Sequence, residues 1–155
     1  MTSNEDLAAQ ALRPGRDAVT EAVTRGVGRA LGDLGYGVLT EMSLATGRRA
    51  DVMGIDRATR IVIVEVKSSI EDFRADQKWQ EYREWCDQLF FAVAEDFPRD
   101  ILPEDAGLMI ADRFNAAIIR PAPVLTLAPA RRRALLLRFA LAASTRLWRA
   151  GDPGG

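Results

Sequence analysis

The sequence predicts a single α/β domain with a central mixed sheet flanked by helices, and three observations predict it. The chain has 155 residues, of which 48% are apolar and 28% are charged, which is the size and composition of one globular domain. Segments with helical periodicity and segments with strand periodicity alternate along it. Two strand segments, 50–56 and 60–67, are joined by a turn of only three residues, so they must pair antiparallel and the sheet cannot be purely parallel.

Three segments are predicted to be helices. Residues 17–34 carry one apolar stripe at helical spacing, and Gly35 suits the position that follows a helix. The stripe consists of Val19, Val23, Val27, Ala30 and Leu34. Residues 74–86 have the same spacing and follow a turn in which Ser69 suits a helix cap. The last helix, 129–149, begins with a proline, which is favoured in the first turn.

Six segments are predicted to be strands. They are 36–42, 50–56, 60–67, 89–94, 108–111 and 116–120. The run 61–66 is apolar on both faces, so it is expected to be central in the sheet and covered on both sides. The order is α-β-β-β-α-β, followed by a short strand pair and a C-terminal helix. The domain is expected to span 16–150, between a flexible leader of 1–15 and a flexible tail of 151–155.

The chain contains no histidine and a single cysteine, Cys86. This excludes catalysis by a histidine base, zinc sites with histidine ligands, and disulfides within the chain. Ionisable chemistry therefore depends on Asp, Glu, Lys, Arg or Tyr. The net charge of −1 gives no indication of a nucleic-acid partner. The sequence contains no secretory signal and no apolar run long enough to span a membrane, so a cytoplasmic protein is expected.

The residues that suggest a catalytic site are Asp51 and, after the turn, Glu65-Val66-Lys67. If Asp56 pairs with Arg60 across the turn, Asp51 lies directly opposite Glu65. Opposed residues have Cβ atoms about 4.5–5.5 Å apart, and like charges there destabilise a sheet. Two carboxylates at this place therefore favour a divalent cation such as Mg²⁺, held by the carboxylates, water and the oxygens of a phosphate substrate.

Lys67 lies two residues after Glu65 and therefore projects from the same face of the strand. There its ammonium group can orient an attacking water or stabilise the charge that develops on a phosphate. The arrangement suits a phosphodiester hydrolase that works without histidine. The alternative is that Glu65 and Lys67 form a solvated charge pair at the end of the strand, and that Asp51 merely begins the hairpin.

Four short motifs resemble a known family. They are GRRAD at 47–51, EVKSS at 65–69, KWQEY at 78–82 and PEDAGL at 103–108. Together with the order of elements, they resemble the PD-(D/E)xK nuclease superfamily and, within it, the bacterial MmcB-like DNA-repair family, over residues 19–147. Ala50 stands where the superfamily signature has proline, a residue that is often replaced there.

The resemblance implies a restriction-endonuclease-like fold and a DNA nuclease that acts in repair. It further implies a site for Mg²⁺ or Mn²⁺ at Asp51 and Glu65, with Lys67 as the catalytic lysine. Some relatives add an acid from the first helix, but Glu21 falls opposite the apolar stripe and is expected in solvent. Glu41 ends the first predicted strand, and it is either a further metal ligand or an exposed strand-end glutamate.

Four residues are candidates for binding nucleic acid. Arg48 and Arg49 precede Asp51 on a short turn, where they can bind phosphates; the alternative is that Arg49 balances the charge of Asp51. Lys78 and Tyr82 are four residues apart on one helix face, so Lys78 can hold a phosphate and Tyr82 can donate a hydrogen bond near the site. The alternatives are a solvated Lys78 and a Tyr82 that packs in the core.

The leading hypothesis is a metal-dependent DNA endonuclease that acts in DNA repair. The second is a catalytically inactive module of the same fold that binds DNA or a repair-protein partner, because a fold alone does not establish activity. A third, a phosphodiesterase for small nucleotides, is disfavoured by the exposed arginines and by the absence of a glycine-rich phosphate loop. The arginine run 131–133 is expected to lie in solvent, and a homodimer is compatible with cutting two strands.

Overall fold

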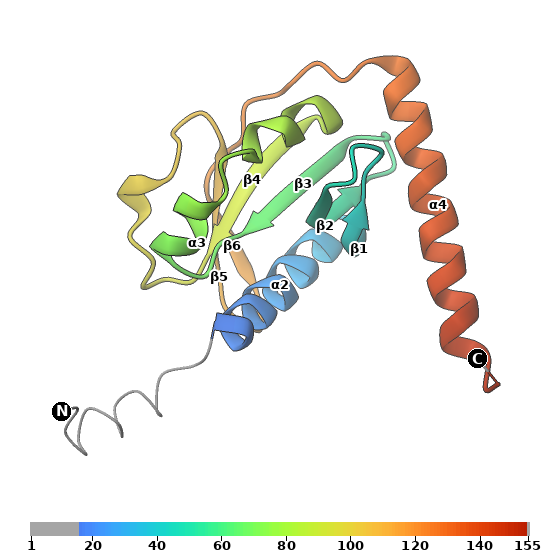
Figure 1. The fold of residues 1–155 in the computed structure, drawn as a ribbon, viewed down its shortest axis with the longest axis horizontal. Helices are drawn as coiled ribbons and strands as arrows, with labels where there is room; N and C mark the ends of the chain where they lie inside the picture. The colour runs from blue at the N-terminus through green and yellow to red at the C-terminus, as the bar shows by residue number, and fades with distance from the viewer. Residues whose placement is uncertain (1–15, 155) are drawn as a thin grey trace.

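The computed structural model describes residues 16–154 and contains one six-stranded mixed sheet flanked by helices (Figure 1). Its elements are α2 (Arg16–Asp33), β1 (Gly37–Ser43), β2 (Arg49–Ile55), β3 (Ile61–Val66), α3 (Ile70–Ala75), the 3₁₀ helix η1 (Trp79–Trp85), β4 (Gln88–Val93), the 3₁₀ helix η2 (Arg99–Ile101), β5 (Gly107–Ala111), β6 (Ala116–Arg120) and α4 (Pro129–Gly151). The predicted fold class is confirmed. The predicted leader, 1–15, lies outside the described residues.

The six strands lie in the sheet in chain order, from β1 to β6. The pairs β1–β2, β2–β3 and β5–β6 are antiparallel, whereas β3–β4 and β4–β5 are parallel. Parallel neighbours require a crossover, and here α3 with η1 leads from β3 to β4, while the loop with η2 leads from β4 to β5. The carboxyl ends of β3, β4 and β5 therefore meet at one edge of the sheet.

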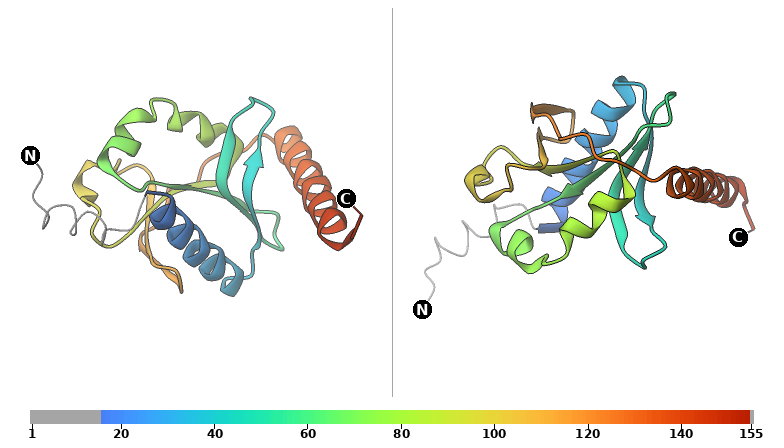
Figure 2. Two further views of the ribbon diagram at one scale, coloured as in Figure 1. Left: turned by 60° about the horizontal axis from the view of Figure 1, so that its bottom comes forward. Right: turned by 90° about the horizontal axis from the view of Figure 1, so that it is seen from above.

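Helical segments cover both faces of the sheet (Figure 2). The core on the α2 side contains Val23, Val27, Leu31, Val52, Val62 and Val64. On the other side Trp79 of η1 packs edge-to-face on Phe91 of β4, with ring centroids 5.2 Å apart. Every residue of β3 is buried, which confirms the central position that its two apolar faces predict.

Helix α2 agrees with the prediction in its extent but not in its last buried residue. Leu31 is buried, whereas Leu34 is 60% exposed. The helix ends at Asp33, and Gly35 takes the left-handed conformation (φ +91°) and donates its N–H to the Gly32 carbonyl at 3.0 Å. Because the chain leaves the helical periodicity before Leu34, that side chain stays in solvent.

The predicted continuous helix 74–86 is wrong. Helix α3 ends at Ala75, and the chain resumes as the 3₁₀ helix η1 at Trp79. The break lies at Asp76, whose backbone is extended (φ −86°, ψ 92°) and whose carboxylate accepts the Lys78 N–H at 3.1 Å. A side chain that bonds a nearby backbone N–H competes with the helix for that donor, so the helix stops here.

The two ends of this segment differ in how far they follow the prediction. At its start, the Ser69 hydroxyl accepts the Asp72 N–H at 3.1 Å and caps α3 as expected. Further on, Lys78 directly precedes η1, and a 3₁₀ helix has three residues per turn. Lys78 and Tyr82 therefore do not share a face of an α-helix, and that prediction is wrong.

Helix α4 lies beside the open edge of β1 (Figure 1). The Arg138 guanidinium donates to the Ser43 carbonyl at 3.3 Å. The Arg146 guanidinium donates to the carbonyls of Thr40 at 2.6 Å and Glu41 at 3.0 Å. These arginines thus take the place of a neighbouring strand along the edge of the sheet.

An ion pair holds the first turns of α4 to the domain. Arg132 donates to both carboxylate oxygens of Asp87 at 2.6 Å, and Asp87 also accepts the Ile61 N–H at 2.7 Å. Asp87 is buried, so its charge needs these partners. Arg132 is therefore an anchor of the helix rather than one of three solvated arginines, as the run 131–133 predicted.

Candidate functional site

The turn that joins β2 to β3 fixes how these strands pair. Asp56 donates its N–H to the Arg60 carbonyl at 3.1 Å, and its carboxylate accepts the Arg60 N–H at 2.9 Å. The predicted pairing of Asp56 with Arg60 is therefore confirmed. The ladder continues in this register to the pair Val52 and Val64.

One residue beyond that pair, the two candidate carboxylates meet. The Asp51 N–H donates to Glu65 Oε1 at 3.2 Å, and the Val66 N–H donates to Asp51 Oδ2 at 2.8 Å. Each carboxylate thus accepts a backbone N–H from the other strand. Glu65 is 4% exposed, and Asp51 is only partly buried. The predicted juxtaposition of Asp51 and Glu65 is confirmed.

Burial makes full ionisation of this pair unfavourable. Burial raises the pKa of Glu65 to about 9, and the charge of Asp51 adds to the shift. Burial also raises the pKa of Asp51, against the opposing effects of the Val66 N–H and the Lys67 charge. When no cation is bound, the pair therefore keeps a proton at neutral pH.

Lys67 is buried beside the pair, and its ammonium group donates to Asp76 Oδ2 at 2.8 Å. Burial alone would raise the pKa of Asp76, but the hydrogen bond and charge of Lys67 outweigh it and lower that pKa. Arg48 lies 4.0 Å from the other carboxylate oxygen of Asp76. Asp76 is thus a site residue that sequence reasoning missed. The signal for it is the polar run 76–78, which interrupts the apolar helical spacing.

The four residues predicted to bind nucleic acid come together. Arg48, Arg49, Lys78 and Tyr82 line one open pocket of about 460 Å³. The Arg48 guanidinium pairs with Glu81 at 2.9 Å and lies 5.3 Å from the centre of the Tyr82 ring. Tyr82 is buried, and its hydroxyl donates to the Arg49 carbonyl at 2.9 Å, so it both packs in the core and bonds next to the site. Arg49 and Lys78 are exposed.

The two candidate accessory acids, Glu21 and Glu41, line a pocket of about 690 Å³ between α2 and β1, which Asp51 also lines. Glu41 has a positive φ of 50°, and Leu39 and Met42 both pack into one core, so the strand alternation breaks at Glu41. Glu21 is exposed, as expected. Within residues 16–154, no group of three or more acidic, histidine or cysteine side chains can hold a metal ion. Glu41 as a metal ligand therefore stays a prediction.

The fold and the site define a class of protein: a mixed-sheet α/β domain with a buried carboxylate pair and a buried lysine at the end of its central strand. In the described part of the chain, no helix is long and apolar enough to cross a membrane.

Comparison with known proteins identifies the family. A family model described as DNA repair protein MmcB-like matches residues 8–154, so the chain belongs to the MmcB-like family, and this membership indicates a role in DNA repair. The chain is also similar to a solved structure, the SPO1766 protein of unknown function from Silicibacter pomeroyi. The two are 46% identical, the match covers 88% of this chain and 94% of that chain, and the TM-score is 0.85. No curated protein matches the chain.

Proposed function

We propose that the protein is a metal-dependent DNA endonuclease that hydrolyses phosphodiester bonds during DNA repair. The observation that carries the proposal is the pair of carboxylates, Asp51 and Glu65, each of which accepts a backbone N–H from the other strand at the end of the buried strand β3. Such a pair destabilises the fold unless a proton or a cation lies between the two groups. If the end of β3 had only a structural role, a neutral residue in place of Glu65 would make the fold more stable.

The donor atoms of the pair suit Mg²⁺ or Mn²⁺. Both groups offer hard carboxylate oxygens, and Mg²⁺ is commonly held by one or two carboxylates together with water and the oxygens of a phosphate. Asp51 and Glu65 would hold the ion, with Glu41 as the candidate for a further ligand. The ion would supply a water of lowered pKa and a positive charge opposite the phosphate.

The remaining residues of the site have separate tasks. Glu65 must release its proton before the pair can hold a cation. Lys67 has three N–H donors, of which Asp76 accepts one, so the others can orient a water or hold a phosphate oxygen. The exposed side chains of Arg49 and Lys78 can position the DNA backbone at the open pocket that they line.

A second candidate function is a module that binds DNA or a repair protein without cutting DNA, and the Lys67–Asp76 ion pair favours it. A buried ammonium group needs an acidic partner for structural reasons alone, so this contact does not require catalysis. In such a module, Asp51 and Glu65 share a proton permanently. The module predicts DNA binding that is independent of Mg²⁺ and that weakens as salt is added.

A cleavage assay separates the two functions. The wild-type protein is incubated with labelled single-stranded, duplex and branched DNA in Mg²⁺, Mn²⁺ or EDTA. Glu65→Gln is purified in parallel, and Glu71→Gln, which changes an exposed acid on α3, is the matched control. Metal-dependent cutting by the wild type and the control, but not by Glu65→Gln, supports the nuclease. Salt-sensitive binding without cutting supports the module, and cutting by Glu65→Gln contradicts the assigned site.

A further inference from the structure

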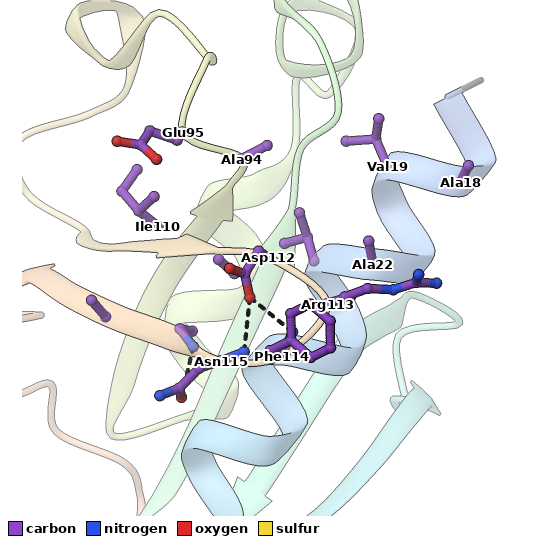
Figure 3. Close-up of a pocket in the computed structure, with 14 residues that line it drawn as sticks. Ala18, Val19, Ala22, Ala94, Glu95, Ile110, Asp112, Arg113, Phe114 and Asn115 are labelled. Carbon is purple, nitrogen blue, oxygen red and sulfur yellow. Dashed lines mark hydrogen bonds between the residues drawn. The ribbon is translucent and has the colours of Figure 1, made fainter. Parts of the chain in front are cut away.

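A second pocket lies at the same edge of the sheet as the carboxylate pair. It has a volume of about 580 Å³ and lies between the first turns of α2 and the turn that joins β5 to β6 (Figure 3). Small apolar side chains line it, mainly those of Ala18, Val19, Ala22, Val23, Ala94 and Ala111. In Figure 3, Glu95 and Ile110 lie on one side of the pocket, and Ala18 and Val19 lie on the other.

The wall of this pocket formed by residues 112–115 is fixed in place. The Asp112 carboxylate accepts the Phe114 N–H at 2.8 Å and the Asn115 N–H at 3.0 Å. The turn also presses directly on α2, because a Cβ atom on Gly26 would collide with the Asp112 carbonyl oxygen. The pocket is therefore formed before any ligand binds.

A largely exposed aromatic ring lies at the rim of the pocket. Phe114 lines the pocket yet is 64% exposed, although turns of this kind usually carry polar residues. The hydrogen bonds of the turn hold its backbone, so little conformational freedom remains to be lost when a flat group stacks on the ring. Exposed aromatic side chains on rigid supports are the platforms on which proteins stack unpaired nucleic-acid bases.

The position of the pocket relative to Lys67 follows from the sheet. Lys67 directly follows β3 and donates its backbone N–H to Ala92 of β4 at 3.1 Å. Glu95 lies just beyond the end of β4, and Asp112 lies just beyond the end of β5. Since neighbouring strands are about 4.8 Å apart, the pocket lies roughly one to two strands from Lys67 along the sheet.

Lys67 shares the parity of Ile61 and Ile63, which face the core of η1, whereas Val23 and Ala111 of the pocket belong to the core under α2. A DNA strand that joins the two sites must therefore pass over the carboxyl ends of the strands, a path longer than the separation along the sheet.

We propose that this pocket receives an unpaired base of the DNA strand whose phosphate lies at the carboxylate pair, with Phe114 stacking on the base. Glu95 supplies an acceptor for the N–H groups of the base edge. The Asn115 side-chain oxygen already accepts the Ala116 N–H at 2.8 Å, so its NH₂ group supplies a donor. Arg113 also lines the pocket and can pair with a phosphate. This assignment rests on the proposed nuclease function and adds the class of its substrate. Bases inside a duplex enter only at the cost of unstacking and unpairing, so the favoured substrate is single-stranded DNA or a single-stranded part of branched DNA.

Binding of a fluorescent base tests the proposal without cleavage. A single-stranded oligonucleotide that carries one 2-aminopurine is titrated with the full chain in EDTA, and the quenching of its fluorescence reports stacking. We expect quenching by the wild type, binding weakened about tenfold by Phe114→Ala, and binding retained by Phe114→Trp. Ala22→Phe, which fills the pocket, should also weaken binding. Val124→Ala is the matched control, because Val124 is an exposed apolar residue that does not line the pocket.

Several outcomes overturn the proposal. They are no binding of the oligonucleotide, equal binding by Phe114→Ala and Val124→Ala, and equal affinity for an oligonucleotide that lacks its bases. The cleavage assay with Glu65→Gln tests the nuclease independently of the base pocket. If the wild type cuts DNA but Phe114→Ala binds normally, only the base pocket is wrong. If the base binds but no DNA is cut, the base pocket is supported and the proposed nuclease activity is wrong.

Discussion

The ammonium group of Lys67 lies 2.8 Å from the carboxylate of Asp76, a residue nine positions further along the chain. Lys67 is only 5% exposed, so its charge depends on this partner. Asp76 lies at the break after α3, where its other carboxylate oxygen accepts the Lys78 N–H at 3.1 Å, so one side chain both ends the helix and binds the lysine.

Asp76→Asn is expected to lower the free energy of unfolding by about 2 kcal/mol, because a charged hydrogen bond to a buried ammonium group is lost. Denaturant unfolding at pH 7 measures the change. Asp100→Asn, which alters an exposed acid of η2, is the control and should leave the midpoint unchanged. Equal midpoints for the two variants would show that Lys67 has another sufficient partner.

The stability of the metal-free protein is expected to fall as the pH rises from about 5 to about 9. The folded chain holds the proton of Glu65 with a pKa of about 9, against an ordinary value of 4.5. A raised pKa in the folded state stabilises the fold at low pH, and this stabilisation is lost as the pH approaches the raised value. The melting temperature in EDTA should therefore drop by at least about 5 °C across this range.

Glu65→Gln is the control for this pH dependence, because it removes the titrating group and should flatten the profile. The acids whose pKa is lowered by ion pairs or hydrogen bonds, such as Asp76 and Asp87, titrate below this window and do not contribute to it. Profiles of the same slope for the wild type and Glu65→Gln would contradict the assignment of the proton to this pair.

Divalent cations should act on the same pair. We expect Mg²⁺ to raise the melting temperature of the wild type at pH 8, because an ion that binds the folded state stabilises it by mass action. Asp51→Asn and Glu65→Gln should each melt higher than the wild type in EDTA, since they remove the cost of keeping either a proton or a second charge on the buried pair at pH 8, and should lose the response to Mg²⁺. A melting temperature in EDTA that is lower in both variants would argue against close carboxylates.

The ion pair of Arg132 with Asp87 is expected to hold α4 on the domain. Arg132→Ala leaves the buried Asp87 carboxylate without its two guanidinium bonds, which should cost about 3 kcal/mol. Hydrogen exchange measures the local effect, and the first turns of α4 should exchange faster than in the wild type. Arg133→Ala, which removes an exposed neighbour, should change neither quantity.

Replacing two glycines of α2 with alanine should change the stability of the fold in opposite directions. Gly26→Ala places a methyl group against the Asp112 carbonyl, so it should destabilise the fold by about 2 kcal/mol or more and disturb the turn that carries Phe114. Gly32→Ala meets no atom within 4 Å, so it should stabilise the helix by about 0.5–1 kcal/mol. Thermal unfolding of the two variants checks the sign of each effect.

The hairpin and its carboxylate pair can be predicted because the signal is local. A short turn leaves one antiparallel register, and strand parity then decides which residues meet, so Asp51 and Glu65 follow from counting outward from Asp56 and Arg60. Spacing alone does not show where a helix ends, and for that reason it places Leu34 on the buried stripe although the side chain is exposed.

The features that the sequence does not predict depend on distant partners or on unusual backbone. The Asp76 carboxylate bonds the nearby Lys78 N–H and also the ammonium group of Lys67 on another element, and the spacing of apolar residues does not reveal the second contact. Glu41 has a positive φ, so the parity argument that places its side chain fails at that residue. Arg132 resembles part of a solvated run because Asp87, its acceptor, lies far away in the sequence.

The arginines of α4 have a consequence for how copies of this protein can associate. Arg138 and Arg146 bind three carbonyls of β1, those of Thr40, Glu41 and Ser43. Within residues 16–154, the other edge of the sheet is β6, where Ile118 and Ile119 are about half exposed. If a sheet can add strands at one edge alone, it can pair with a single neighbour. Strand addition at β6 would therefore favour a closed pair of chains over a fibre.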